Sequence, residues 1–278
     1  MDWKGREQSQ NVEDRRGSGG GGGGRTPGIL GIIVVLIGAY YGVDLSGLVG
    51  TPSMGTGSTQ TSQLKPQEEA ELNELARVVL ADTEKAWGSY FKQIGRTYTP
   101  TTLVLYNGGT STACGMGQSA MGPFYCPGDK KVYLDLDFYR DMQTKLNSAS
   151  DAAFAYVIAH EVGHHVQNLL GILPKVHRMQ QQVGKKEANA LSVKLELQAD
   201  CYAGIWGHYA VNNNIFKPED IPKAMLAAES VGDDRLQKDG QGYVVPDSFT
   251  HGSSEQRMAW LKRGLDSGDI NQCNTFGN

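Results

Sequence analysis

A-H-E-V-G-H-H, at residues 159–165, is the stretch from which the rest of this chain can be understood. It contains the pattern H-E-x-x-H and follows the apolar run F-A-Y-V-I-A at 154–159, whose lack of strict alternation favours a helix. Residues four apart on a helix share one face and lie about 6 Å apart along the axis. His160 and His164 can therefore bind one metal ion together, while Glu161 can reach a water molecule on that ion.

A catalytic zinc site has three protein ligands and an open position for water, so a third ligand must lie elsewhere. The extended pattern H-E-x-x-H-x-x-G-x-x-H is excluded, because Gln and Leu stand at its last two positions. The later stretch 191–210 is apolar on most sides and holds Glu196 and Asp200 one helical turn apart. Because a buried carboxylate needs a partner, Glu196 is the expected third ligand. Asp200 is expected to accept a hydrogen bond from the far ring nitrogen of His160, which would fix the tautomer of that ring.

Other polar residues are weaker candidates for the metal. Glu187, His177 and His208 lie in more polar or aromatic settings and have no paired acid. His165 points about 100° away from its neighbour on a helix, which favours a solvent or core position. His251 lies in a Gly/Ser turn, from which it could donate a hydrogen bond to the oxyanion of a tetrahedral intermediate. A structural or solvent-exposed role is the alternative for His251.

The first part of the 278-residue chain divides into segments of different character. Residues 1–26 are polar and Gly-rich, which predicts a disordered tail. Residues 27–43 carry no charge and would span about 26 Å as a helix, the short end of a transmembrane length. Basic residues precede this run, so the positive-inside rule places the tail in the cytoplasm and the following domain outside the cell membrane. The alternatives are a cleaved signal peptide, for which 42–44 is a poor cleavage site, and a buried core helix.

The remainder is predicted to hold one compact domain. Residues 44–65 are expected to be a flexible linker, and residues 66–278 are enough for a single core. The net charge of −4, the pI of 5.9 and the lack of a basic patch argue against nucleic acid as a partner. A helical pattern at 67–94 is followed by strand patterns at 101–106 and 131–136. The second strand is predicted to be either an edge strand that pairs with an extended peptide or an ordinary internal strand.

The four cysteines are compatible with two disulfides in a domain outside the cytoplasm, although spacing alone leaves their pairing open. Cys114 and Cys126 lie in the Gly- and Ser-rich stretch 107–128, a predicted loop that a disulfide would close; two unpaired thiols are the alternative. A bridge from Cys273 to Cys201 would tie the C-terminal tail to the helix that supplies the third ligand.

Several stretches together resemble the neutral zinc metallopeptidase family of bacteria. The resemblance is carried by M-D-W-K-G-R at 1–6, N-V-E-D-R-R-G at 11–17, M-G-P-F-Y-C-P at 121–127, V-Y-L-D-L at 132–136, the H-E-x-x-H helix, residues 196–200 and T-H-G-S-S-E-Q-R at 250–257. It implies a mostly helical α+β, zincin-like metallopeptidase domain with a small sheet, preceded by one transmembrane helix. The pair Glu196 and Asp200 is also similar to that of thermolysin-like peptidases and of the membrane peptidases that process prenylated proteins, in which the Glu binds zinc.

The sequence thus predicts a membrane-anchored zinc peptidase that acts on peptides or proteins. His160, His164 and Glu196 would hold Zn²⁺, which activates water and polarises the scissile carbonyl group, and Glu161 would act as general base. A non-catalytic, membrane-tethered zinc-binding assembly factor is the alternative. Structural zinc sites usually have four protein ligands, often Cys, which favours catalysis here. A zinc hydrolase acting on a non-peptide amide is a third hypothesis.

Overall fold

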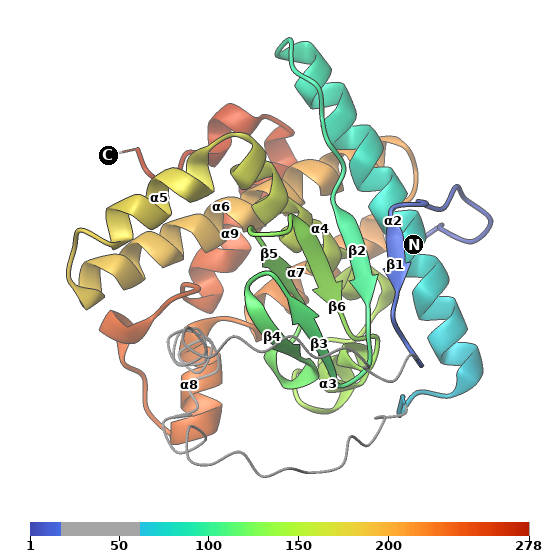
Figure 1. The fold of residues 1–278 in the computed structure, drawn as a ribbon, viewed down its shortest axis with the longest axis horizontal. Helices are drawn as coiled ribbons and strands as arrows, with labels where there is room; N and C mark the ends of the chain where they lie inside the picture. The colour runs from blue at the N-terminus through green and yellow to red at the C-terminus, as the bar shows by residue number, and fades with distance from the viewer. Residues whose placement is uncertain (18–61, 278) are drawn as a thin grey trace.

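The computed structural model describes residues 1–17 and 62–277, in which helices cover one face of a small sheet (Figure 1). The helices are α2 (Pro66–Gln93), α3 (Phe138–Thr144), α4 (Asp151–Leu169), α5 (Ile172–Gln180), α6 (Lys185–Asn212), α7 (Ile221–Ser230), α8 (Asp233–Gln241) and α9 (Ser254–Ser267). The strands are β1 (Val12–Asp14), β2 (Thr102–Leu105), β3 (Gly109–Thr112), β4 (Gly115–Gln118), β5 (Phe124–Cys126) and β6 (Lys131–Leu134). Short 3₁₀ turns are η2 (Ser119–Met121), η3 (Pro218–Asp220), η4 (Pro246–Ser248) and η5 (Ile270–Cys273). The predicted mostly helical α+β class is confirmed.

The main sheet has the strand order β1-β2-β6-β5, with β1, β2 and β6 parallel and β5 antiparallel to β6. Its side chains alternate between the two faces, as the pleat of a strand requires. Leu103, Leu105 and Leu134 join the main core beneath the helices. Val104 and Tyr133 join a smaller apolar cluster on the opposite face. The two strand patterns read from the sequence therefore form the buried centre of this sheet.

The strand β6 is internal, since it lies between β2 and β5. Of the two alternatives for residues 131–136, pairing with a substrate as an edge strand is therefore wrong. The edge position belongs to β5, which comes from the stretch 107–128 predicted to be a loop. That stretch also forms the antiparallel pair β3–β4. These strands are short and rich in glycine, so their period-two pattern is too weak to identify from sequence.

The two helices that supply the candidate metal ligands cross closely. Helix α4 begins after Ser150, whose Oγ accepts a hydrogen bond from the backbone N–H of Ala153 at 3.0 Å. It continues through the apolar run into the H-E-x-x-H pattern and packs against α6. Gly163, inside the pattern, has no Cβ; one added there would lie 3.0 Å from the carbonyl oxygen of Ala199 on α6. This glycine lets the backbone of α6 approach the metal-binding turn.

Residues 1–17 are part of the folded domain, so the prediction of a disordered tail is wrong for them. Strand β1 pairs with β2, and Trp3 is 4 % exposed. The sequence gives no sign of this strand, because β1 is short and polar and its hydrogen-bonding partner β2 lies far along the chain. A strand cannot pair with a sheet across a membrane. A cytoplasmic position for residues 1–17 and an extracytoplasmic domain are therefore incompatible with this sheet.

The rest of the predicted tail, the predicted transmembrane run 27–43 and the linker up to residue 61 lie outside the described residues. In residues 1–17 and 62–277, no helix has both the length and the apolar character needed to cross a membrane.

The cysteines form two disulfides, Cys114–Cys126 and Cys201–Cys273. Both bridges considered from the sequence are present. The first closes the stretch that contains β3, β4 and β5, and the second joins α6 to the C-terminal turn η5. Disulfides persist in oxidising compartments, which indicates that this domain matures outside the cytoplasm.

Candidate metal centre and active site

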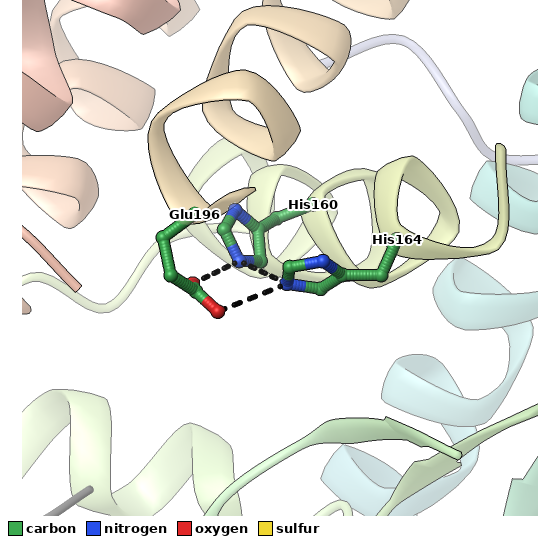
Figure 2. A group of neighbouring side chains, drawn as sticks. All are labelled: His160, His164 and Glu196. Atoms are coloured by element: carbon green, nitrogen blue, oxygen red, sulfur yellow. Dashed lines mark hydrogen bonds and ion pairs between the residues drawn. The ribbon is translucent and has the colours of Figure 1, made fainter. Parts of the chain in front are cut away.

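His160 and His164 on α4 face Glu196 on α6, and their side chains converge on one point (Figure 2). The Nε2 atom of His160 lies 3.1 Å from Oε2 of Glu196, and that of His164 lies 3.3 Å from Oε1. The two Nε2 atoms are 3.2 Å apart. The three ligands expected from the sequence are thus brought together.

The hydrogen bonds of the two Nδ1 atoms show which ring nitrogens can bind a cation. Nδ1 of His160 lies 2.8 Å from Oδ1 of Asp200, and Nδ1 of His164 lies 2.9 Å from Oε1 of Gln167. Carboxylate and amide oxygens only accept hydrogen bonds, so both Nδ1 atoms carry protons. In the neutral form that binds a metal, each ring turns a lone pair on Nε2 toward Glu196. Two imidazole lone pairs beside a carboxylate are a donor set that suits zinc.

The spacing of the donor atoms also fits zinc. Zinc–nitrogen and zinc–oxygen bonds of about 2.0–2.2 Å in a tetrahedron give ligand–ligand separations of about 3.3–3.6 Å. The three separations here are 3.1, 3.2 and 3.3 Å. The donor atoms need to move apart by only a few tenths of an ångström to hold the ion.

Asp200 connects the metal centre to α9. It is fully buried, and its two oxygens accept hydrogen bonds from Nε and Nη2 of Arg257 at 2.8 and 3.0 Å. The hydroxyl group of Tyr156 donates to the same carboxylate at 2.6 Å. Burial raises the pKa of Asp200, but Arg257 and His160 outweigh this effect and bring it to about 2. Asp200 therefore stays ionised and holds the ring of His160 in place.

Glu161 is the acidic residue of the pattern that does not join the ligand cluster. It is 5 % exposed, and burial raises its pKa, although His160 and His164 oppose that shift. A carboxylate whose pKa is raised is a stronger base than an ordinary Glu side chain.

A pocket with mainly apolar walls adjoins Glu161. It lies among α3, α4, α8 and the turn after α7. Its lining residues are Pro123, Phe138, Leu146, Tyr156, Val157, His160, Glu161, Val231, Leu236, His251 and Arg257. The charge of Arg257 is compensated by Asp200. The pocket therefore suits an apolar side chain better than a charged one.

A second, more polar pocket shares Glu161 with the first. It is lined by Phe124, Tyr125, Pro127, Glu161, His164, Leu173, His177, Gln180, Ser192, Leu195 and Glu196. The edge strand β5 borders both pockets: Pro123, just before it, lines the apolar pocket, whereas Phe124 and Tyr125 line the polar one. The two pockets therefore have Glu161 in common and are lined by successive residues at the start of β5.

His251 lines the apolar pocket and is 5 % exposed. Its Nδ1 atom lies 3.2 Å from Oδ1 of Asp233 and 2.9 Å from the hydroxyl group of Thr250. Oδ2 of Asp233 also accepts the backbone N–H groups of Thr250, His251 and Gly252 at 2.8, 2.6 and 3.0 Å. Burial raises the pKa of Asp233, but His251 outweighs this effect and lowers it. Asp233 thus fixes both the loop and the ring of His251.

The weaker candidates lie apart from the three ligands. Nδ1 of His208 is 2.9 Å from the carbonyl oxygen of Leu265, and Glu187 is exposed at the start of α6. His177 lines the polar pocket without joining the cluster of donor atoms. His165 is buried, with its nitrogens 2.9 Å from the Tyr125 hydroxyl group and 2.7 Å from the carbonyl oxygen of Thr99.

The sequence did not reveal three of the supporting residues. Gln167 was considered only as the place where a rival pattern has glycine. Tyr156 looked like one more member of an apolar run, and only its burial beside Asp200 shows its polar role. Asp233 lies far from His251 along the chain, and no spacing rule connects the two.

The chain matches the family model described as "Putative neutral zinc metallopeptidase" over residues 1–276. It is 54% identical to "Uncharacterized protein YpfJ" of Escherichia coli over 287 aligned positions, which cover 100% of this chain and 99% of the relative. It is 40% identical to "Uncharacterized protein Rv2575" of Mycobacterium tuberculosis over 219 positions, which cover 74% of this chain and 73% of the relative. No solved structure matches the chain.

Proposed function

Because the chain belongs to the neutral zinc metallopeptidase family, we propose that it hydrolyses peptide bonds with a zinc ion held by His160, His164 and Glu196. The observation that carries this proposal is the convergence of two imidazole Nε2 atoms and one carboxylate, with Glu161 next to them on α4. When bound, zinc supplies Lewis acidity, which activates a water molecule and polarises the scissile carbonyl group.

Glu161 is the proposed general base. It accepts a proton from the attacking water molecule and passes it to the leaving amine. Its buried position supports this role, because burial raises the pKa of the carboxyl group and so makes the carboxylate a stronger base.

His251 is the proposed hydrogen-bond donor to the oxyanion that develops on the substrate carbonyl group. Thr250 and Asp233 hold Nδ1 of the ring, and a hydroxyl group of Thr250 that donates to Nδ1 places the ring proton on Nε2, from which it can be donated to the oxyanion. A donor that is already oriented needs no reorganisation when charge develops, which is how such groups lower a barrier. Asp233 is a positioning residue in this scheme.

The direction of the edge strand β5 predicts the direction in which a peptide substrate binds. An extended peptide can add to an exposed sheet edge, and antiparallel pairing is the more stable arrangement. Strand β5 runs from the apolar pocket at Pro123 toward the polar pocket at Tyr125. An antiparallel substrate then runs from the polar pocket to the apolar pocket. The residue just after the cleaved bond therefore occupies the apolar pocket, and we expect it to be large and apolar.

Two observations support a site of action outside the cytoplasm. The domain carries two disulfides, and the uncharged run 27–43 supports attachment to a membrane. The proposed enzyme is thus a membrane-attached peptidase whose metal centre faces an extracytoplasmic compartment.

The substitution Glu161→Gln tests the reaction. It keeps the shape of the side chain and removes its basicity, so peptide hydrolysis should fall by about 10²- to 10⁴-fold while zinc content stays near one ion per chain. Glu187→Gln, at an exposed position on α6, is the matched control and should keep full activity. Wild-type turnover by the zinc-loaded Glu161→Gln variant would contradict the proposal and favour a non-catalytic zinc protein.

The substitution Leu236→Asp tests the apolar pocket. It places a carboxylate on the wall formed by α8, so peptides with Leu or Phe after the cleaved bond should be cut at least about 10-fold more slowly. A peptide library with sequenced products measures the preference on each side of the bond. Gln241→Asp, at the exposed end of the same helix, is the control. A changed preference before the bond, with none after it, would mean that the substrate runs the other way.

A further inference from the structure

Residues 1–17 are attached to the domain along their whole length. Trp3 is 4 % exposed and donates from Nε1 to the carboxylate of Asp151 at 2.7 Å, in the first turn of α4. Further along, Ser9 donates from its backbone N–H to the carbonyl oxygen of Arg77 on α2 at 3.0 Å. The N-terminal segment therefore touches the same helix that carries the candidate metal ligands.

Strand β1 completes one edge of the main sheet, as Figure 1 shows beside β2. Val12, Glu13 and Asp14 are in parallel register with residues 103–105 of β2. Leu103 donates to the carbonyl oxygen of Asn11 at 2.9 Å, and Arg15 donates to that of Leu105 at 2.8 Å. Main-chain hydrogen bonds of this kind form only if both segments are in the same compartment.

Ion pairs join residues 1–17 to residues far along the chain. Glu13 pairs with Lys131 of β6 at 2.7 Å, and Glu7 pairs with Lys85 of α2 at 2.7 Å. Arg16 pairs with Glu69 in the first turn of α2 at 2.8 Å. The last described residues before position 18 therefore lie beside the start of α2, close to where the chain resumes at position 62.

The apolar run 27–43 has 17 residues, enough for one helical crossing of a membrane but not for two, which would need about 40 residues. A single crossing would put residues 1–17 and the domain on opposite sides. The sheet requires them on the same side, and the disulfides Cys114–Cys126 and Cys201–Cys273 place that side outside the cytoplasm.

We propose that residues 1–17 lie outside the cytoplasm, on the same side of the membrane as the domain whose sheet they complete. This inference concerns topology and stands apart from the proposed activity.

Thiol labelling of the full chain tests the proposal. All four cysteines are in disulfides, so an added cysteine is the one free thiol. Gln8→Cys reports on the N-terminal segment and Gln93→Cys, at the end of α2, reports on the domain; both positions are exposed. A membrane-impermeant maleimide added to intact spheroplasts should label the two variants to the same extent. Labelling of Gln8→Cys only after permeabilisation, or of neither variant before it, would overturn the proposal.

Zero-length cross-linking of the membrane-bound wild-type chain is the second measurement. A carbodiimide should join Glu13 to Lys131 and Glu7 to Lys85, and mass spectrometry of the digest identifies both links. Asp141 and Lys145, 2.8 Å apart within the domain, are the internal control. Detection of the control link without either N-terminal link would show that residues 1–17 are not on the domain. Neither experiment depends on zinc or on turnover, so its failure is distinguishable from failure of the proposed function.

Discussion

At the scale of single residues, the two histidine ligands differ in what holds their outward nitrogens. His160 is held by the carboxylate of Asp200, whose charge is balanced by Arg257. His164 is held by the neutral amide of Gln167. Spacing along a helix was enough to predict the contact of Asp200, because an E-x-x-x-D pair places both acids on one face. It was not enough for Gln167, since a glutamine three residues after a histidine has many roles on a helix.

The substitution Gln167→Leu should weaken zinc binding by about 10- to 100-fold, because the ring of His164 loses the acceptor that fixes its tautomer. It also leaves the carbonyl oxygen of Leu195 without its donor from Gln167, which should cost about 1–3 kcal/mol of stability. Competition with a chromogenic chelator measures the affinity, and thermal unfolding with and without zinc separates the two effects. Gln182→Leu, at an exposed position, should change neither quantity. Unchanged zinc affinity in Gln167→Leu would remove this residue from the metal centre.

At the scale of elements, the crossing of α6 and α9 holds the metal centre together. A Cβ atom at Gly264 on α9 would overlap the carbonyl oxygen of Cys201 on α6, and one at Gly204 would overlap that of Leu261. The two backbones are therefore in near contact. Because α9 carries Arg257 and α6 carries Asp200, this crossing sets the distance between the buried guanidinium group and the carboxylate.

The substitution Gly264→Ala should destabilise the domain by at least about 1–3 kcal/mol, since a methyl group at the crossing forces α9 away from α6. Zinc affinity should fall as well, because Arg257 moves with its helix. Gly88→Ala is a matched control in α2, where a Cβ atom would meet nothing within 4 Å. That variant should be more stable than wild type by about 0.5–1 kcal/mol, the usual gain for Gly→Ala inside a helix. Equal stability changes for the two variants, measured by urea unfolding, would refute the close crossing.

At the scale of the whole molecule, a long-range disulfide and the N-terminal segment each connect parts of the structure that are far apart along the chain. The disulfide Cys201–Cys273 closes a loop of 72 residues and attaches the C-terminal turn to the residue next to Asp200. The disulfide Cys114–Cys126 closes a loop of only 12 residues. In the chain-entropy description, a longer loop restricts the unfolded chain more and stabilises the fold more.

Replacing both members of the long-range bridge, as Cys201→Ala with Cys273→Ala, should lower the free energy of unfolding by about 2–5 kcal/mol. The double replacement Cys114→Ala with Cys126→Ala should cost roughly 1.5 kcal/mol less than the first, because loop-closure entropy grows with the logarithm of loop length. Denaturant unfolding of both variants gives the comparison. A larger loss from the short loop would show that native-state strain or packing, not chain entropy, dominates.

The sequence by itself determined what depends on residues near one another along the chain. The four-residue spacing of His160 and His164 and the pair Glu196 and Asp200 follow from the geometry of a single helix. The alternating strands β2 and β6 follow from the period of a pleated sheet. These features need no knowledge of how the helices pack.

Only the tertiary structure decided which distant segments meet. Strand β5 became the sheet edge that borders both pockets, although its residues read as a loop. Asp233 became the partner of His251, and residues 12–14 became a strand of the main sheet, although they read as part of a polar tail. The physical reason is the same in each case. A short or polar segment has little hydrophobic pattern of its own, and its conformation is stabilised by hydrogen bonds and ion pairs to residues that only folding brings near.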